Sequence, residues 1–222
     1  MSKRIYDVRT RQGLAKSKNF FVPNGVHLNE IIHLPSEKVF RDSFVYVGHL
    51  KKEKGIHSIV TSMPRIVENF PCACLIVIGD GPYRGQLESL INELNLQNHV
   101  SLLGSMSNEN ILKEIGQYGI GLAPYTDEDY NFYCSPVKVK EYLAAGCPVI
   151  ITNVPDISFD VSRYDLGFVV DEKNFQEEFT LGAIKLLENP ELCDIYKRNA
   201  LNYASKFDWD AIYEQVFRKV LA

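Results

Sequence analysis

The residues best suited to chemistry lie in the run 134–141, which reads CSPVKVKE. Ser135 is a good N-cap and Pro136 a good first helical residue, so this run predicts the start of a helix. Lys138 and Lys140 would then lie in the first turn, where cations are unfavourable by about 0.3–1 kcal/mol each. A bound anion would offset that cost, because free backbone N–H groups and a lysine together form a phosphate site. The alternative is that both lysines point into solvent.

Two further groups could complete such a site. Glu141 follows about one turn after the start of the helix, where its carboxylate could accept hydrogen bonds from sugar hydroxyls. The loop GHLKKEKG (48–55) places lysines just before another predicted helix, with His49 beside them. These lysines could neutralise phosphate, although a solvated basic loop explains them about as well.

Two motifs elsewhere are weaker. The run Gly79-Asp80-Gly81-Pro82 allows a sharp turn close to a ligand, but a structural turn between strand and helix explains it equally well. Asp127-Glu128-Asp129 has the spacing of carboxylates that hold a divalent cation. We interpret it as a solvated loop, because a phosphate site made of a helix N-terminus and lysines needs no metal. We therefore expect no metal and no cofactor.

Short apolar runs and helical patterns alternate along the chain and must position these residues. The runs, rich in β-branched residues, are predicted as strands buried on both faces: 43–48, 73–79, 99–104, 119–125, 147–152 and 166–171. Helical spacing of apolar residues predicts the helices: 55–70, 82–96, 108–118, 136–145, 175–187, 190–203 and 208–221.

This alternation predicts an α/β fold, a three-layer α/β/α Rossmann-like domain with a parallel sheet. Ligands of such sheets bind at the carboxyl ends of strands, which is where the lysine loop and the helix near 136 begin. The loop after the first strand lacks the G-x-G-x-x-G spacing, which disfavours a dehydrogenase. We divide the chain into a linker remnant (1–41) and a ligand-binding domain (42–222).

Composition excludes several classes of protein. The 222 residues carry a net charge of −4, so nothing draws the whole chain to nucleic acid or to anionic lipid. Neither a membrane-spanning run nor the apolar core of a signal peptide is present in the sequence, which predicts a cytoplasmic protein with at most peripheral membrane association. The five cysteines lack paired spacing and are predicted to be reduced thiols.

An ordered set of motifs resembles a known family. VGHLKKEKG (47–55), LIVIGDGP (75–82), VSLLG (100–104), SPVKVKEYLAAGCPVI (135–150) and FDWDAIYEQV (207–216) resemble the C-terminal, donor-binding domain of retaining GT-B glycosyltransferases of family four, the glycosyl transferases group 1. FFVPNGV (20–26) resembles the segment that enters this domain from an N-terminal acceptor domain. The resemblance implies the C-terminal half of a GT-B fold, with the acceptor domain missing from this chain.

The resemblance also implies roles for single residues. Lys54 would be the lysine that binds the donor diphosphate, and His49 stands where the family has a partner arginine. Backbone amides of Val137, Lys138 and Val139 would hold the same diphosphate.

The remaining roles concern the ribose, the sugar and the base. Glu141 would be the second glutamate of the family's Glu-x7-Glu motif and the ribose ligand, whereas Tyr133 replaces the first glutamate, so donor identity does not carry over. The donor sugar would lie beside Tyr133 and Ser135. The loops expected near the nucleobase contain Gly79, Gly81, Leu103 and Gly104. No catalytic residue is assigned.

The expected function is transfer of a sugar from a nucleoside diphosphate sugar to an acceptor, either a sugar such as surface polysaccharide or a lipid-linked one. In this family the reaction retains configuration and needs no metal. Without an acceptor domain the chain should be inactive alone. The alternatives are a stand-alone nucleotide-sugar-binding module or partner subunit, and a sugar-nucleotide epimerase.

Overall fold

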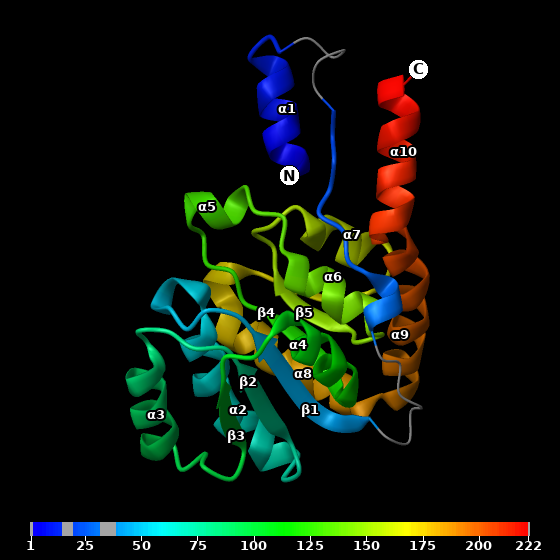
Figure 1. Ribbon diagram of the computed structural model, residues 1–222. Helices are drawn as coiled ribbons and strands as arrows, with labels where there is room; N and C mark the ends of the chain where they lie inside the picture. The colour runs from blue at the N-terminus through cyan, green and yellow to red at the C-terminus, as the bar shows by residue number, and fades with distance from the viewer. Residues whose placement is uncertain (1, 15–19, 32–38, 222) are drawn as a thin grey trace.

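A six-stranded parallel sheet forms the centre of the molecule (Figure 1). The computed structural model describes residues 2–14, 20–31 and 39–221. The strand order is β3-β2-β1-β4-β5-β6. The strands are β1 (Phe40–Val47), β2 (Cys74–Ile78), β3 (Val100–Gly104), β4 (Tyr118–Ala123), β5 (Val149–Thr152) and β6 (Gly167–Val170). All six predicted strands are confirmed, with β1 beginning at Phe40 instead of Ser43.

Helices cover both faces of the sheet, which confirms the three-layer α/β/α fold. One face is covered by α2 (Ile56–Asn69), α3 (Arg84–Glu93) and α8 (Phe175–Glu188). The other is covered by α4 (Asn108–Glu114), α6 (Val137–Ala144), α7 (Ile157–Arg163) and the C-terminal part of α9 (Pro190–Ala204). The apolar runs are continuous because both faces of each central strand need apolar side chains. In β1, for example, Phe44 and Tyr46 pack on one face, and Val45 and Val47 on the other.

The first part of the chain contains a helix that the sequence patterns did not predict, α1 (Lys3–Arg11). Its N-cap is Ser2, whose hydroxyl accepts a hydrogen bond from the Ile5 amide at 3.2 Å. Helix α1 and the last helix, α10 (Trp209–Leu221), both extend beyond the three layers at the same end of the molecule (Figure 1).

The segment that leads into the sheet is tied to the C-terminal turn. The Val26 amide donates to the Phe207 carbonyl at 2.8 Å, and the Trp209 amide donates back to the Val26 carbonyl at 3.1 Å. Both ends of the domain therefore meet beside α6. In the described part of the chain, no helix is both long enough and apolar enough to cross a membrane.

Candidate functional site

The strand order marks one place in the sheet as a ligand site. β1 and β4 are neighbours, with β2 and β3 on one side of them and β5 and β6 on the other. At such a switch point the loops that leave the two strands diverge, and ligands of open parallel sheets bind in the crevice between them. The loop after β1 carries Lys54, and the loop after β4 leads into α6. The topology thus indicates the same region as the sequence motifs.

Close packing brings these two loops together. Gly55, the N-cap of α2, has φ +72°, and a Cβ atom there would lie 2.1 Å from the Pro124 carbonyl oxygen. The Thr126 hydroxyl donates to the Glu53 carbonyl at 2.6 Å. The loop after β1 therefore rests on the loop after β4, and Lys54 is held at their junction.

Two lysines, one from each loop, lie in the crevice. Lys54 Nζ donates to Asn131 Oδ1 at 3.3 Å. Lys138 Nζ lies 4.3 Å from the ring centroid of Tyr46 and 4.9 Å from that of Tyr125. Within the residues that the structure describes, neither lysine has a carboxylate at ion-pair distance. Among the described side chains, the crevice therefore holds two lysines that form no ion pair, although the charge of Glu141 acts on Lys138 from a longer distance.

The pKa values of both lysines reflect this environment. Burial, and then the charge of Lys54, lower the pKa of Lys138 to about 7, although Cys134 and Glu141 act in the opposite direction. Burial also lowers the pKa of Lys54. Two cations destabilise each other in this way when no anion lies between them, so the crevice suits an anionic ligand.

Helix α6 begins at the same crevice, one residue later than predicted. Pro136 is the N-cap with φ −68° and ψ 115°, and Val137 is the first helical residue, so the prediction of Ser135 as the cap was wrong. The reason is that the Ser135 carbonyl accepts a hydrogen bond from Asn24 Nδ2 at 2.9 Å, and the chain stays extended through Pro136. No side chain caps α6, so its first N–H groups are available to a ligand.

Lys140 does not share the site, contrary to the prediction that both lysines of the first turn face an anion. It is buried, its Nζ donates to the Asn24 carbonyl, and it lies 4.3 Å from the ring centroid of Phe207. Two residues along a helix differ by about 200° around its axis, so Lys138 and Lys140 point to opposite sides. Lys140 instead fastens the entering segment to α6.

Glu141 lies one turn into α6, with its side chain in a neighbouring pocket. The pocket is lined by Glu141, Val137, Asn108, Trp209 and the segment 24–27. Burial raises the pKa of Glu141. No side-chain hydrogen bond holds its carboxylate within the described residues, so the carboxylate is available to donors on a ligand. Its role as a ribose ligand remains a prediction.

Three other predicted residues lie around the crevice. His49 is exposed, and its carbonyl accepts a hydrogen bond from the Tyr46 hydroxyl at 3.4 Å. Tyr133 is 40% exposed and packs edge-on against Phe132. Val139 is fully buried in the core, so only its backbone could contact a ligand. The positions of these three residues neither support nor contradict their predicted contacts with a ligand.

The predicted base-side glycines have a packing role that the sequence did not show. A Cβ atom on Gly79 would lie 1.9 Å from the Gly48 carbonyl oxygen, and one on Gly81 would lie 2.4 Å from that of Leu50. These glycines let the loop after β2 stack on the loop after β1. Leu103 is 44% exposed and Gly104 accepts a hydrogen bond from the Gly79 amide, so both lie beside this stack.

The sequence patterns missed the residues that surround the two lysines. Asn131 is fully buried and holds Lys54, while the rings of Tyr46 and Tyr125 lie under Lys138. The tyrosines occur in apolar runs, where aromatic residues are ordinary core residues. Nothing in the sequence separated them from the rest of the core.

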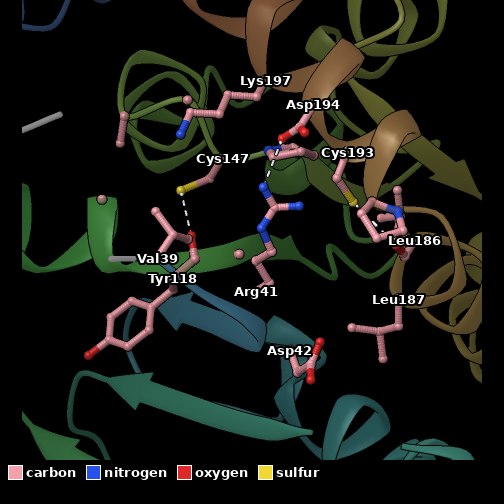
Figure 2. A pocket seen from close by; sticks show the side chains of 16 residues that line it. Val39, Arg41, Asp42, Tyr118, Cys147, Leu186, Leu187, Cys193, Asp194 and Lys197 are labelled. Carbon is pink, nitrogen blue, oxygen red and sulfur yellow. Dashed lines mark hydrogen bonds and ion pairs between the residues drawn. The ribbon is translucent and has the colours of Figure 1, made fainter. Parts of the chain in front are cut away.

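Other groups of charged residues do not form a second centre. No three His, Cys, Asp or Glu side chains in the described ranges are grouped to hold a metal ion, and the side chain of Asp129 lies outside those ranges. A small pocket lies near the amino ends of β1 and β4 (Figure 2). Its Arg41 pairs with Asp194 at 3.4 Å, and Cys147 donates to the Tyr118 carbonyl. It faces away from the crevice, at the end of the sheet where ligands of such folds do not bind.

The fold and the crevice together define a Rossmann-like domain with two lysines and a helix N-terminus at its switch point. The chain belongs to the glycosyl transferases group 1 family, whose model matches residues 36–203. A similar curated protein is the alpha-monoglucosyldiacylglycerol synthase of Acholeplasma laidlawii, 28% identical over 90% of this chain and 51% of that protein. These matches confirm the predicted family.

Solved structures show the same fold. The Anabaena protein HepE, in a complex with UDP-glucose, has a TM-score of 0.81 at 18% identity, over 99% of this chain and 62% of that one. The C-terminal domain of LpcC, a glycosyl transferase group 1 family protein from Francisella tularensis, has a TM-score of 0.66 at 16% identity and is matched over 97% of its length, against 82% of this chain. The chain spans between 25% and 51% of the length of three curated relatives that it matches. It corresponds to the C-terminal part of GT-B glycosyltransferases.

Proposed function

We propose that residues 42–222 form the donor-binding domain of a glycosyltransferase, which binds a nucleoside diphosphate sugar, and that residues 1–41 connect it to the rest of the enzyme. The observation that carries the proposal is the pair Lys54 and Lys138, two half-buried lysines that form no ion pair with any described side chain, beside the uncapped N-terminus of α6. A diphosphate supplies the missing charge and accepts hydrogen bonds from the first N–H groups of the helix.

The chemistry follows from this placement. As the bond between the sugar and the diphosphate breaks, negative charge grows on the leaving phosphate, and fixed cations and N–H groups stabilise that charge. A hydroxyl of the acceptor, which is a sugar or a lipid-linked molecule, attacks the sugar carbon and passes its proton to the leaving phosphate, so that the products are the glycoside and the nucleoside diphosphate. We propose that the reaction retains configuration, as the family resemblance implies. We also propose that it needs no metal or cofactor, because the lysines supply the positive charge. Transfer would need an acceptor-binding domain, and the family match favours transfer over epimerisation.

Glu141→Ala should weaken binding of UMP and UDP by similar factors, roughly 10-fold each, because the lost hydrogen bonds go to the ribose that both ligands share. Calorimetric titration of both nucleotides into the wild type and the variant measures this. Failure of the wild type to bind UDP, GDP, ADP and TDP alike would end the proposed function. Loss of UDP binding alone in the variant would move Glu141 from the ribose to the phosphate.

Binding of UDP-glucose should weaken as the pH rises from 6 to 8.5. The pKa of Lys138 is about 7, so above that pH the free protein is mostly neutral at Lys138 and must take up a proton to bind the diphosphate. Each pH unit above 7 should cost up to about 1.4 kcal/mol, or tenfold in Kd. Calorimetry across this range gives the slope.

A matched variant distinguishes the contribution of Lys138 to this pH dependence from that of other titrating groups. Lys138→Arg keeps its charge throughout the range, because the guanidinium does not lose its proton, and its profile should be flatter. Equal slopes in the wild type and Lys138→Arg would show that another group is responsible.

A further inference from the structure

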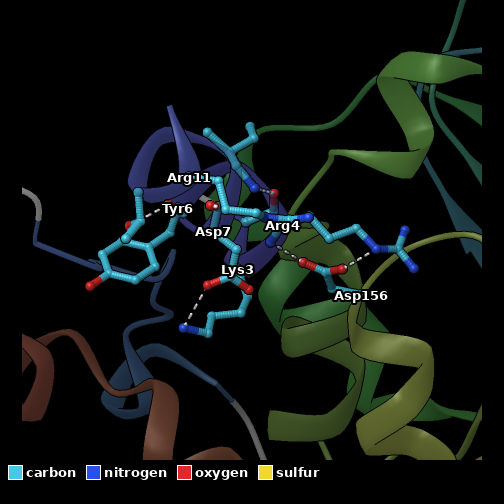
Figure 3. Close-up of polar contacts among 9 residues, drawn as sticks. Lys3, Arg4, Tyr6, Asp7, Arg11 and Asp156 are labelled. Carbon is cyan, nitrogen blue, oxygen red and sulfur yellow. Dashed lines mark hydrogen bonds and ion pairs between the residues drawn. The ribbon is translucent and has the colours of Figure 1, made fainter. Parts of the chain in front are cut away.

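Helix α1 is joined to the candidate site through Arg4. The Arg4 backbone amide donates to Asp156 Oδ2 at 2.9 Å, and its Nε lies 2.6 Å from Asp156 Oδ1 (Figure 3). Both side chains are about one-fifth exposed, at 19% and 21%. This pair is thus more shielded than the surface ion pair of Lys3 and Asp7 in the same helix, whose side chains are 58% and 44% exposed.

The rest of the Arg4 guanidinium bridges two loops. Nη1 donates to the Phe132 carbonyl at 2.8 Å and to the Val154 carbonyl at 2.6 Å. The guanidinium carbon also lies 3.6 Å from the ring centroid of Phe132. Phe132 is the last residue of α5 (Asp129–Phe132), a short helix in the connection after β4, and Val154 and Asp156 belong to the loop after β5. One arginine therefore links loops that leave neighbouring strands at their carboxyl ends.

Phe132 is directly connected to the crevice. The residue before it, Asn131, is buried, accepts a hydrogen bond from Lys54 and donates to the Thr126 carbonyl at 3.0 Å. The residues after it, 133–136, lead to the start of α6. The segment 133–135 lies between two anchors, the Phe132 carbonyl held by Arg4 and the Ser135 carbonyl held by Asn24 Nδ2 at 2.9 Å, so Arg4 fixes its first end.

We propose that Arg4 is a positioning residue, which fixes the segment 133–135 against the sugar end of the donor site without touching the donor. This inference rests on the proposed function. An arginine suits the role because its planar fork reaches two carbonyls and a carboxylate at once, whereas a lysine donates from a single point. Helix α1 would thus stabilise the donor site from outside, through the contacts of Arg4.

The test uses Arg4→Gln, with Arg11→Gln as the matched control in the same helix. Arg11 is exposed and its Nε donates only weakly, at 3.4 Å, to the Asp7 carbonyl one turn earlier. In hydrogen exchange, Arg4→Gln should speed the amides of 132–135 by about tenfold and leave those of β4 and β5 unchanged, because only the local opening becomes easier. Arg11→Gln should match the wild type.

Binding measurements then show whether Arg4 positions the sugar end of the donor site or stabilises the whole domain. Arg4→Gln should weaken binding of UDP-glucose by about tenfold and binding of UDP by less than about threefold. The reason is that the segment 133–135 is no longer held in place, and only the sugar end of the donor site depends on it. Arg4→Lys should behave like Arg4→Gln. If Arg4→Lys behaves like the wild type, or if both ligands weaken equally, the inference is overturned. If the wild type binds no nucleoside diphosphate, the proposed function and the sugar-end role both fail. Unchanged hydrogen exchange in Arg4→Gln would show that Arg4 does not fix the segment 133–135.

Discussion

Replacing Lys54 by alanine should weaken binding of UDP by about 1.5–3 kcal/mol, roughly 10–150-fold in Kd. Lys54 is held between the loops after β1 and β4 by Asn131, and it has no carboxylate partner among the described residues. Its charge is thus available to the phosphates. The loss should be smaller for UMP, because one of the two phosphates that Lys54 can reach is missing. Calorimetric titration of both nucleotides gives the ratio.

Lys51→Ala is the matched control for this measurement. Lys51 lies in the same loop but is exposed, so its removal changes the net charge equally without emptying the crevice. We expect a change of at most about 0.5 kcal/mol, since exposed charges are well screened. Equal losses in the two variants would mean that UDP responds to the general charge of the loop. Wild-type affinity in Lys54→Ala would place the diphosphate elsewhere.

Gly55→Ala should destabilise the domain by roughly 2–5 kcal/mol and also remove UDP binding, because two costs combine at this residue. Its φ of +72° is unfavourable for alanine, and the added Cβ would lie 2.1 Å from the Pro124 carbonyl oxygen. The oxygen belongs to the backbone after β4 and cannot rotate away. Relief of the clash must separate the two loops and so displace Lys54. Urea unfolding measures the free energy, and titration at low temperature measures binding.

Gly85→Ala is the control for the loss of a glycine. Gly85 lies in α3, and a Cβ atom there would meet no other atom within 4 Å. Alanine should stabilise this helix by about 0.5–1 kcal/mol and leave UDP binding unchanged. If Gly55→Ala is as stable as Gly85→Ala and binds UDP normally, the loops after β1 and β4 are not packed as described.

The sequence predicted those helices and strands that show a regular pattern of apolar residues. Each strand is a short apolar run, and long helices such as α2 and α8 carry a full apolar stripe, so burial is visible in the order of residues. Three helices were missed: α1, α5 (Asp129–Phe132) and α7. The last two have four and seven residues, too few to show a period, and no residue of α1 itself is buried. Helix α1 is held by the polar contacts of Arg4 and by Tyr6, which packs edge-on against Phe21, and no helical period of apolar residues reveals these contacts.

The candidate site, like the fold, was predictable from the sequence only in its local features. By itself the sequence determined that a lysine loop follows β1 and that a helix with early lysines begins near Pro136, because turn and cap preferences are local. Only the tertiary structure decided which lysines meet. Strand order places the loops after β1 and β4 side by side, and the rotation of α6 turns Lys138 to Tyr46 and Lys140 to Asn24. Those contacts join residues far apart in the chain, and no local preference encodes them.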